Sequence, residues 1–371
     1  MEKSLLDLYT DYLISSFGPT TATGLERLLE GEISHDQVTR FLASAPKTSA
    51  DLWSQAKPLL RQIETLDGVL IIDDSIEEKP YTDENELICW HWDHSKEAHV
   101  KGIQFLTAFY TTAQLKLPLA FDLVTKTETY IDPKTGKQKR RSSISKNERA
   151  RMLLHICVHN QVKFTYVLSD LWYASADNMK YIHHVLHKHF VLPLKENRKV
   201  ALSRAEQQRG QYVAVSTLDL PVGTTREIWL EDVDFPLLLT KEVFTNADGS
   251  TGVRYLVTDD LALTYDRITT LFQKRWSVEV YHKSLKQNAS LAKSPTRTET
   301  TQRNHLFASL CAYLKLESLK LQTGHNHFAL KSKIYLKRVH KSFACSYRRL
   351  ATLSTPRIFR VSDVFRHAGN S

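Results

Sequence analysis

The pattern of hydrophobic and polar positions divides the chain into a helical N-terminal part and a longer part in which strands and helices alternate. Within residues 1–66, apolar side chains recur at the spacing of amphipathic helices, as in Leu5, Leu6, Tyr9, Tyr12 and Leu13. TATGLERLLEGEISHDQVTRFLASA predicts two short helices around Gly31 and Glu32, with Ser34 as the N-cap of the second. This outline is that of a helix-turn-helix, but a plain helical hairpin is the more frequent structure.

From residue 68 onward, short apolar runs predict strands. GVLIID predicts a strand over 68–73 that ends at two aspartates, and HVKGIQFLTAFYTT and LKLPLAFDLVTK predict two more. A polar loop is predicted over 125–146, and Ser145 and Glu148 then form a capping box that opens a helix. VKFTYVLSD predicts a fourth strand ending at Asp170, and a short helix leads to a fifth strand, HFVLPLKEN.

Residues 195–257 break this order with short strand-like runs separated by turn signals, which predicts a mostly β insertion. Two helices follow, DDLALTYDRITTLFQKRWSVEVYHKSLKQ and TETTQRNHLFASLCAYLKLESLK. The element order predicts an α/β fold with a mixed sheet flanked by helices. We predict an N-terminal helical DNA-binding region over 1–66, a main domain over 67–194 and 258–322, the β-rich insertion over 195–257, and a basic C-terminal region over 323–371.

Composition adds a strong positive charge to this picture. The 371 residues carry a net charge of +9 and a pI near 9.2, a balance that nucleic-acid binders often show. No apolar run approaches the roughly 18 residues that a membrane helix requires, and MEKSLLDLYTDYL does not resemble a signal peptide. Four cysteines without a CxxC pair indicate reduced thiols. We therefore expect a cytoplasmic protein without a membrane partner.

The first late helix carries a stripe of unusual composition. Phe272, Arg275, Glu279 and Lys286 fall on one helix face, and an acid between two bases is uncommon in a core. One interpretation is a salt-bridged surface, in which Glu279 pairs with Lys283 at i, i+4. The other is that Glu279 belongs to a functional site.

Two further acids support the second interpretation. Asp74 follows the first predicted strand and Asp170 ends the fourth. Hard divalent cations take oxygen ligands, and two Mg²⁺ ions about 3.5–4 Å apart can stabilise the attacking and leaving oxygens of a phosphodiester. Asp74, Asp170 and Glu279 are therefore our candidate metal ligands, with Mg²⁺ as the metal and Mn²⁺ as its substitute. Neighbouring Arg and Lys side chains would hold the phosphates.

The order of these acids resembles that of the DDE transposases of bacterial insertion sequences, within the retroviral-integrase superfamily of RNase H-like folds. FQKRWSVEVYHKSLKQ resembles the Y-x2-R-x3-E-x6-K signature of one large insertion-sequence group. Arg275, Glu279 and Lys286 match this signature in register, whereas Phe272 stands where Tyr is usual. The resemblance covers about residues 66–320.

The same resemblance implies roles for individual residues. LIIDDSIEEKP resembles the first block of the group and selects Asp74 over Asp73 as the ligand, and VLSDLWYAS selects Asp170. The resemblance also implies an RNase H-like fold with a β insertion before the helix of the signature. In relatives that cleave through a DNA hairpin, the Trp after the signature Arg manages a flipped base, which implies that role for Trp276. Trp229 is a second candidate for contact with a flipped base, although the simpler interpretation is that it is a buried aromatic side chain.

Other segments are rich in bases or in histidines. The predicted loop over 134–151 holds eight bases, of which Arg140 and Arg141 are our candidates for phosphate contacts; the alternative is a solvated loop. After Glu317 no acid occurs before Asp363, while ten bases do, which predicts a DNA-facing surface. CWHWDHSKEAH has no four-ligand zinc spacing, and we expect its Trp92-Asp93-His94 to form a turn near the active site.

These observations predict a cut-and-paste transposase. It would bind the terminal inverted repeats of its element and its target as double-stranded DNA, act as a homodimer on DNA, and associate with a prokaryotic nucleoid. Water would be the first nucleophile and the freed 3′-OH the second. Two alternatives stay open: an RNase H-like nuclease or resolvase without strand transfer, and a catalytically silent DNA-binding protein derived from a transposase.

Overall fold

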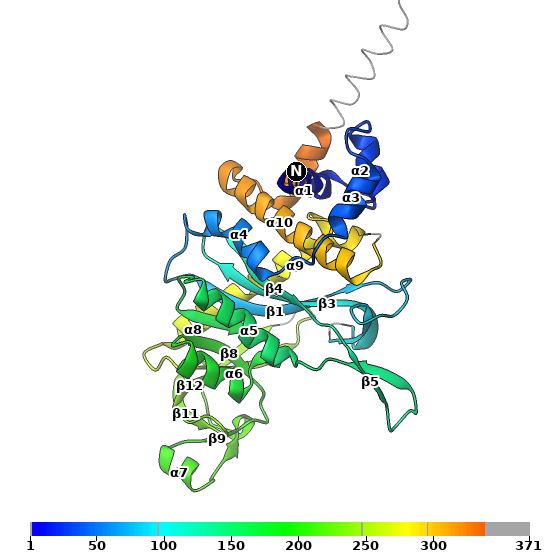
Figure 1. The fold of residues 1–371 in the computed structure, drawn as a ribbon. Helices are drawn as coiled ribbons and strands as arrows, with labels where there is room; N and C mark the ends of the chain where they lie inside the picture. The colour runs from blue at the N-terminus through cyan, green and yellow to red at the C-terminus, as the bar shows by residue number, and fades with distance from the viewer. Residues whose placement is uncertain (1, 95, 246–247, 295, 338–371) are drawn as a thin grey trace, which may run out of the picture.

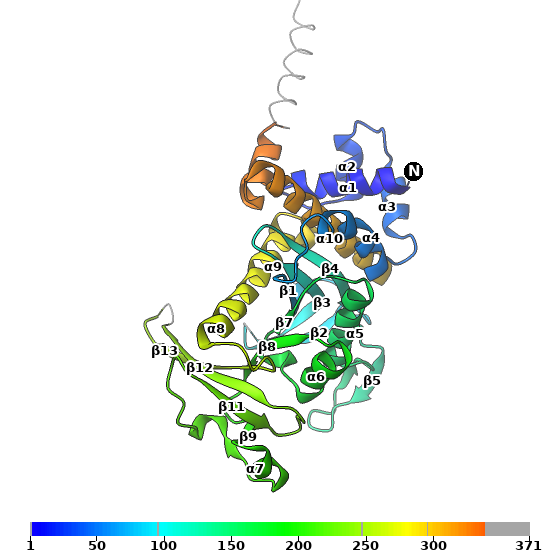
Figure 2. The same cartoon turned by 90° about the vertical axis from the view of Figure 1, so that its left-hand side faces the viewer.

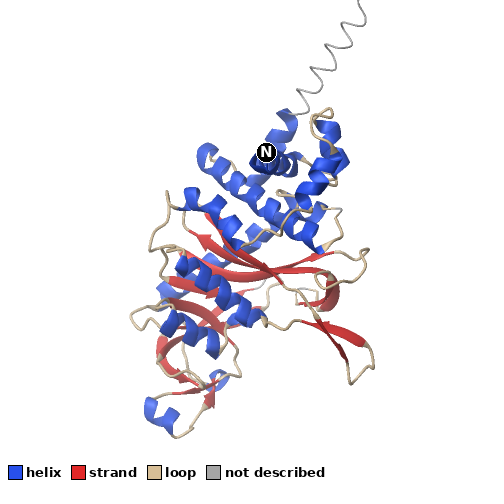
Figure 3. Cartoon of the chain, viewed as in Figure 1, coloured by secondary structure: helices blue, strands red, loops and turns tan. Residues whose placement is uncertain are grey.

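One large mixed sheet with helices on both faces forms the centre of the molecule (Figures 1 and 3). The structure is a computed structural model that describes residues 2–94, 96–245, 248–294 and 296–337. In chain order the strands are β1 (Val69–Glu78), β2 (Cys89–Asp93), β3 (Ala98–Thr111), β4 (Lys116–Leu123), β5 (Glu128–Ile131), β6 (Gln138–Arg141), β7 (Tyr166–Ser169), β8 (His189–Leu194), β9 (Lys199–Ala201), β10 (Val213–Ala214), β11 (Thr225–Leu230), β12 (Leu237–Thr245) and β13 (Thr251–Thr258).

Most helices lie at one end of the molecule or on the two faces of the sheet, and α7 lies at the opposite end beside β9 (Figure 2). In chain order they are α1 (Glu2–Ser15), α2 (Ala22–Leu28), α3 (His35–Leu42), α4 (Ser49–Leu60), α5 (Lys146–His159), α6 (Ala176–Lys180), α7 (Arg204–Gln208), α8 (Tyr265–Gln273), α9 (Ser277–Gln287) and α10 (Glu299–Thr323). Within the described part of the chain, none of these helices is long and apolar enough to cross a membrane.

The strand order confirms the predicted α/β fold with an RNase H-like mixed sheet. The five predicted strands form the order β4, β3, β1, β7, β8, in which β1 is antiparallel to β3 and parallel to β7. The insertion continues this sheet, because β13 pairs with β8 and is followed outward by β12, β11, β9 and β10. Residues 195–257 therefore extend the sheet rather than form a separate one.

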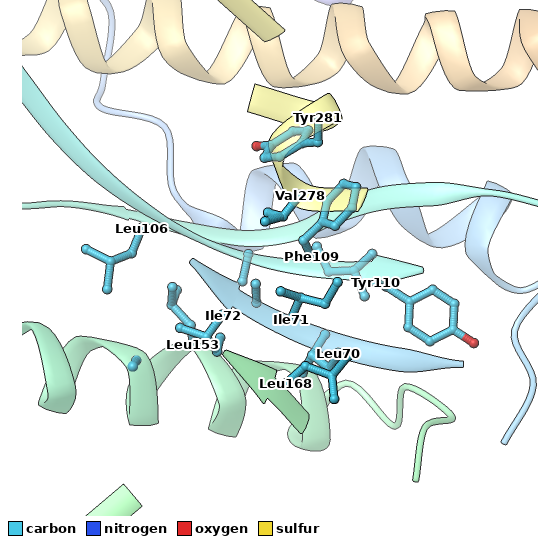
Figure 4. Packing of buried hydrophobic residues seen from close by; sticks show 14 of the residues in the cluster. Leu70, Ile71, Ile72, Leu106, Phe109, Tyr110, Leu153, Leu168, Val278 and Tyr281 are labelled. Carbon is cyan, nitrogen blue, oxygen red and sulfur yellow. The ribbon is translucent and has the colours of Figure 1, made fainter. Parts of the chain in front are cut away.

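Strand β1 is buried on both faces in its first half, which explains its run of apolar residues. Val69 to Ile72 are at most 1% exposed. Ile72 lies toward Leu153 of α5, whereas Val278 and Tyr281 of α9 pack on the opposite face of the sheet (Figure 4). Because side chains alternate along a strand, Asp73 points to the α9 side with Ile71, and Asp74 points to the α5 side with Ile72.

The sequence prediction that the first strand ends at the two aspartates is wrong. Strand β1 continues to Glu78, and its polar half pairs with β3 from Asp73, opposite Thr107, to Glu78, opposite Gly102. The prediction failed because apolar content marks only the buried half of a strand, whereas the 14 residues of β3 bond the backbone of the whole of β1. The two aspartates therefore lie within a paired strand, where their directions are fixed.

Two other predicted elements differ in form. The predicted loop over 125–146 contains the hairpin of β5 and β6, which turns through Gly136 at a φ of 64° and extends away from the sheet (Figure 1). The predicted long helix is α8 and α9 joined by a 3₁₀ turn, Lys274–Trp276. The helix predicted to open at a capping box is confirmed as α5, with both hydrogen bonds of the Ser145 and Glu148 box present.

The N-terminal helices pack on α10 and on the sheet. The Tyr9 hydroxyl lies 2.9 Å from His305 Nδ1 of α10, and Ser49 of α4 exchanges hydrogen bonds with the backbone of Phe121 in β4. Ser34 is the N-cap of α3, as predicted, and it also forms a capping box with Gln37. DNA binding by residues 1–66 stays a prediction. Of the predicted basic C-terminal region, residues 338–371 lie outside the described part of the chain.

A buried carboxylate ties α10 to β4 and predicts a pH-dependent contribution to stability. Glu317 accepts from the Lys116 backbone N–H at 3.1 Å and from Lys320 at 3.1 Å, and lies 2.9 Å from His327 Nε2. Burial alone would raise its pKa, but His327 and Lys320 lower it overall. A carboxyl whose pKa is lowered by folding stabilises the protein above its unfolded pKa, and this stabilisation is lost as the pH falls through the folded value.

We therefore expect Glu317→Gln to lower the free energy of unfolding by about 2 kcal/mol at pH 7. The difference from wild type is expected to shrink as the pH falls below about 4.3, the ordinary pKa of a glutamate. Urea unfolding at neutral pH and at successively lower pH measures both values. A difference that stays constant with pH would show that the charge of Glu317 is not the source of the stabilisation.

Candidate active site

Four carboxylates converge where β1, β7 and α9 meet. The parallel pairing of β1 with β7 places Ile72 opposite Ser169, so that Asp73 and Asp74 lie beside Asp170, the residue after β7. Asp73, Asp74, Asp170 and Glu279 all line one open pocket of about 500 Å³. The same pocket is lined by four bases, Lys146, Arg275, Lys283 and Lys286.

Arg275 links the first strand to the late helix. Its Nη1 lies 3.9 Å from Asp73 Oδ2 and 3.6 Å from Glu279 Oε1. Burial raises the pKa of Asp73 well above its usual value, the charges of Asp170 and Asp74 raise it further, and Arg275 opposes this shift. Asp73 is thus a buried carboxylate that is only partly compensated by one guanidinium.

Asp74 has different neighbours because it points to the other face of the sheet. Lys146 Nζ donates to its two carboxylate oxygens at 3.2 and 3.3 Å, and the Gln104 amide donates to Oδ2 at 2.6 Å. The Tyr173 hydroxyl also donates to Oδ1. Lys146 is the first residue of α5, and its capping box fixes where that helix begins. Asp74 is therefore held by three donors from three elements.

Asp170 connects the carboxylates to the segment that follows β7. Its Oδ1 accepts from the Trp172 backbone N–H at 2.9 Å and so caps the 3₁₀ turn Leu171–Tyr173. Burial and the charge of Asp74 raise the pKa of Asp170, and the Trp172 N–H and Arg275 oppose the shift. This cap fixes Trp172 relative to the carboxylate.

The stripe on the late helix faces β1 in the structure. Glu279 forms its ion pair with Arg275, one turn earlier, rather than with Lys283. Lys286 Nζ donates to the carbonyl of Ile76 in β1 at 2.7 Å, which ties the end of α9 to the polar half of the strand. Phe272 is 4% exposed, and Arg275 and Arg254 both lie over its ring, so the aromatic ring at this position belongs to the packing.

The chemistry of the donor set fits a hard divalent cation. The pocket offers carboxylate oxygens from β1, from the residue after β7 and from α9, and Asp93 of β2 also lines it. Oxygen ligands are those that Mg²⁺ and Mn²⁺ prefer. Glu279 is about half exposed, with a side-chain exposure of 47%, so it can turn toward the other carboxylates. In the arrangement that the described residues adopt, no three acidic, histidine or cysteine side chains form a ready metal site.

The remaining predicted contact residues lie elsewhere. Trp276 is 67% exposed and lines a separate pocket with Lys274 and the turn between β3 and β4. Arg140 and Arg141 both lie on β6 of the hairpin. Arg140 Nε lies 3.7 Å from Glu84 Oε1, and Arg141 Nε donates to Glu128 Oε2 at 2.8 Å. The structure therefore does not bring these three residues into the carboxylate pocket.

Sequence reasoning missed several residues that line the carboxylate pocket or contact its acids. Lys146 was counted only as one base of a loop, and Tyr173 and Gln104 were not considered. Their contacts with Asp74 join elements far apart in the chain, so no local spacing signals them. Trp92, Asp93 and His94 were expected to form a turn near the site. Trp92 does line the pocket, but Trp92 and Asp93 belong to strand β2 rather than to a turn.

Similarity to known proteins shows the family of the chain. No curated protein matches the sequence. The family model described as "Transposase DDE domain" matches residues 90–315, more than half of the 371 residues. This match includes Asp170 and Glu279 but begins after β1, so it does not cover Asp73 or Asp74. The chain belongs to the transposase DDE domain family, a class of enzymes that act on DNA.

Proposed function

We propose that the protein cleaves the ends of its own mobile element and joins them to target DNA with a divalent metal. The observation that carries this proposal is the convergence of Asp73, Asp74, Asp170 and Glu279 in one pocket that four basic side chains also line. The family membership supports DNA as the partner and a divalent metal as the cofactor. We further propose that the protein binds the terminal inverted repeats of its element, follows a cut-and-paste route and acts as a homodimer on DNA.

The pocket residues divide into ligands and phosphate contacts. Bound Mg²⁺ or Mn²⁺ would activate water and then the 3′-OH and would stabilise the leaving oxygen. Asp170 and Glu279 would hold the metal together with one of the two β1 aspartates. Arg275, which lies beside Asp73 and Glu279 at the same pocket, would contact phosphate oxygens of the bound DNA. Lys286 uses one of its three N–H donors on Ile76, so two are available for phosphate.

The contacts favour Asp73 as the first ligand, whereas the sequence resemblance selects Asp74. Asp73 shares Arg275 with Glu279, and the charge of Glu279 is among the influences on its pKa. Asp74 is engaged by Lys146 and Tyr173 on the opposite side of β1. We propose Asp73 as the ligand that acts with Glu279 and Asp74 as the residue that positions Lys146; substitution of each aspartate separates the two assignments.

The DNA beyond the pocket would be bound by basic segments. The β5–β6 hairpin presents Lys134 and Lys137 in addition to Arg140 and Arg141, and the hairpin is exposed on both strands. An isolated two-stranded hairpin is only marginally stable in water, so contact with DNA would order it further. We propose that Arg140 and Arg141 exchange their acidic partners for phosphates when DNA binds.

The test uses the wild-type chain and linear DNA that carries the sequences flanking its gene. With Mg²⁺ or Mn²⁺ we expect nicks at the element ends and joined products with a second DNA, and with EDTA we expect neither. Cleavage without joined products would instead support the nuclease or resolvase. Binding of the DNA without cleavage under any metal condition would contradict the catalytic proposal and would leave a silent DNA-binding protein.

A further inference from the structure

Exposed aromatic rings border the carboxylate pocket on the side of α5 and β2. Trp92 is 45% exposed and Trp172 is 49% exposed, and both line the pocket. The His94 ring lies between them, with centroids 6.3 Å from Trp92 and 5.5 Å from Trp172. Large aromatic side chains are usually buried, so two half-exposed tryptophans that share one pocket indicate a contact surface. We call Trp92, His94 and Trp172 the aromatic platform.

The aromatic platform is attached directly to the acidic residues. The Trp172 backbone N–H donates to Asp170 Oδ1 at 2.9 Å, so Trp172 lies in a capped 3₁₀ turn two residues after a proposed metal ligand. Lys146 Nζ lies 4.6 Å from the centre of the Trp172 ring while it donates to Asp74. A group that stacks on Trp172 would therefore lie beside the position of the reacting phosphate.

Trp92 is fixed from the other side by the sheet. Its strand β2 pairs with β3, Trp92 lies opposite His99, and the two rings are 5.1 Å apart. Along β2, Cys89 and His91 are buried, so Trp92 must point outward by the alternation of the strand. Both tryptophans are thus positioned by rigid elements, and neither depends on a long loop.

We propose that the aromatic platform stacks unpaired bases of a DNA strand next to the reacting phosphate. The inference rests on the proposed function of the carboxylate pocket. Every base offers a π face, so aromatic rings beside a basic groove bind single strands without regard to sequence. The basic side chains of Lys146, Lys283 and Lys286, which line the same pocket, would bind the phosphate backbone of that strand. This role differs from the one predicted for Trp276, which lies on a separate pocket.

The test measures stacking directly and without cleavage. A short single strand that carries one 2-aminopurine, and a blunt duplex of the same sequence, are titrated with the full chain in EDTA. We expect the single strand to bind with quenching of the 2-aminopurine fluorescence. Trp172→Ala and Trp92→Ala are expected to weaken single-strand binding by roughly 5- to 100-fold, the equivalent of about 1–3 kcal/mol at 1.4 kcal/mol per tenfold, and to remove the quenching.

Matched variants separate stacking from a structural effect. Trp172→Phe keeps an aromatic face and is expected to retain most of the affinity. Trp90→Ala removes a tryptophan of β2 that is 52% exposed but does not line the pocket, and it is expected to behave as wild type. Affinity for the blunt duplex is expected to change little in any variant.

Two results would overturn the proposal. Unchanged single-strand binding by folded Trp172→Ala and Trp92→Ala would show that the platform does not contact bases. An equal loss for single strand and duplex would show a contact with the backbone only. Because no cleavage enters this assay, its failure leaves the metal-dependent reaction intact, and a lack of cleavage by the wild type in the joining assay leaves the stacking result intact.

Discussion

Glu279→Gln is expected to abolish metal-dependent cleavage while the protein remains folded. The change keeps the shape of the side chain but removes the charge that would hold the cation. Losing several kcal/mol of metal stabilisation corresponds to a fall in rate of roughly 10³-fold or more, at 1.36 kcal/mol per tenfold. Glu279 is about half exposed, so its replacement is expected to leave thermal stability nearly unchanged. Single-turnover cleavage of a labelled DNA end measures the loss.

The control for this variant is a glutamate with the same local contact. Glu299 in the first turn of α10 forms an i, i+4 ion pair with Arg303, as Glu279 forms one with Arg275 over the same spacing. Glu299→Gln is expected to cleave as wild type. Cleavage unchanged in both variants would return Glu279 to the interpretation of a salt-bridged helix surface.

The two β1 aspartates complete this experiment. If Asp73 is the ligand, Asp73→Asn is expected to match the loss of Glu279→Gln and to remove Mn²⁺ binding. Asp74→Asn would then retain metal binding and lose only part of the rate, because the amide keeps one acceptor oxygen but removes the negative charge that pairs with Lys146. Loss of Mn²⁺ binding in Asp74→Asn alone would instead establish the residue that the sequence resemblance selects.

Phe109→Ala is expected to lower the free energy of unfolding by about 3–5 kcal/mol, the range for removing a buried aromatic. Phe109 of β3 is fully buried and stacks on Tyr281 of α9, with ring centroids 4.4 Å apart and an interplanar angle of 25° (Figure 4). The cavity would weaken the packing of α9, which carries Glu279, on strand β3. Urea unfolding followed by tryptophan fluorescence measures the change.

An exposed aromatic provides the comparison for this stability effect. Tyr81 is 99% exposed, and Tyr81→Ala is expected to change the free energy of unfolding by less than about 0.5 kcal/mol. A loss in Phe109→Ala no larger than that in Tyr81→Ala would show that the β3–α9 contact does not stabilise the fold.

The class of fold and the family could be predicted from local features of the chain. Local features carry this information: apolar runs mark buried strands, the Ser145 and Glu148 box marks the start of α5, and the signature around Glu279 depends only on helical spacing. These features can be recognised in the sequence because hydrophobic periodicity and capping each depend on only a few neighbouring residues. The order of strands and helices then left few topologies for the sheet.

The arrangement of the carboxylate pocket depends on contacts between elements and could not be predicted from the chain. Alternation along β1 separates Asp73 from Asp74, but which aspartate meets α9 depends on which face of the sheet each helix covers. Tyr173 reaches Asp74, and Lys146 reaches both Asp74 and the Trp172 ring, through contacts between distant segments. The paired length of β1 follows from the length of β3. Such contacts have no signature in the linear sequence, because they arise from packing between elements rather than from spacing within one.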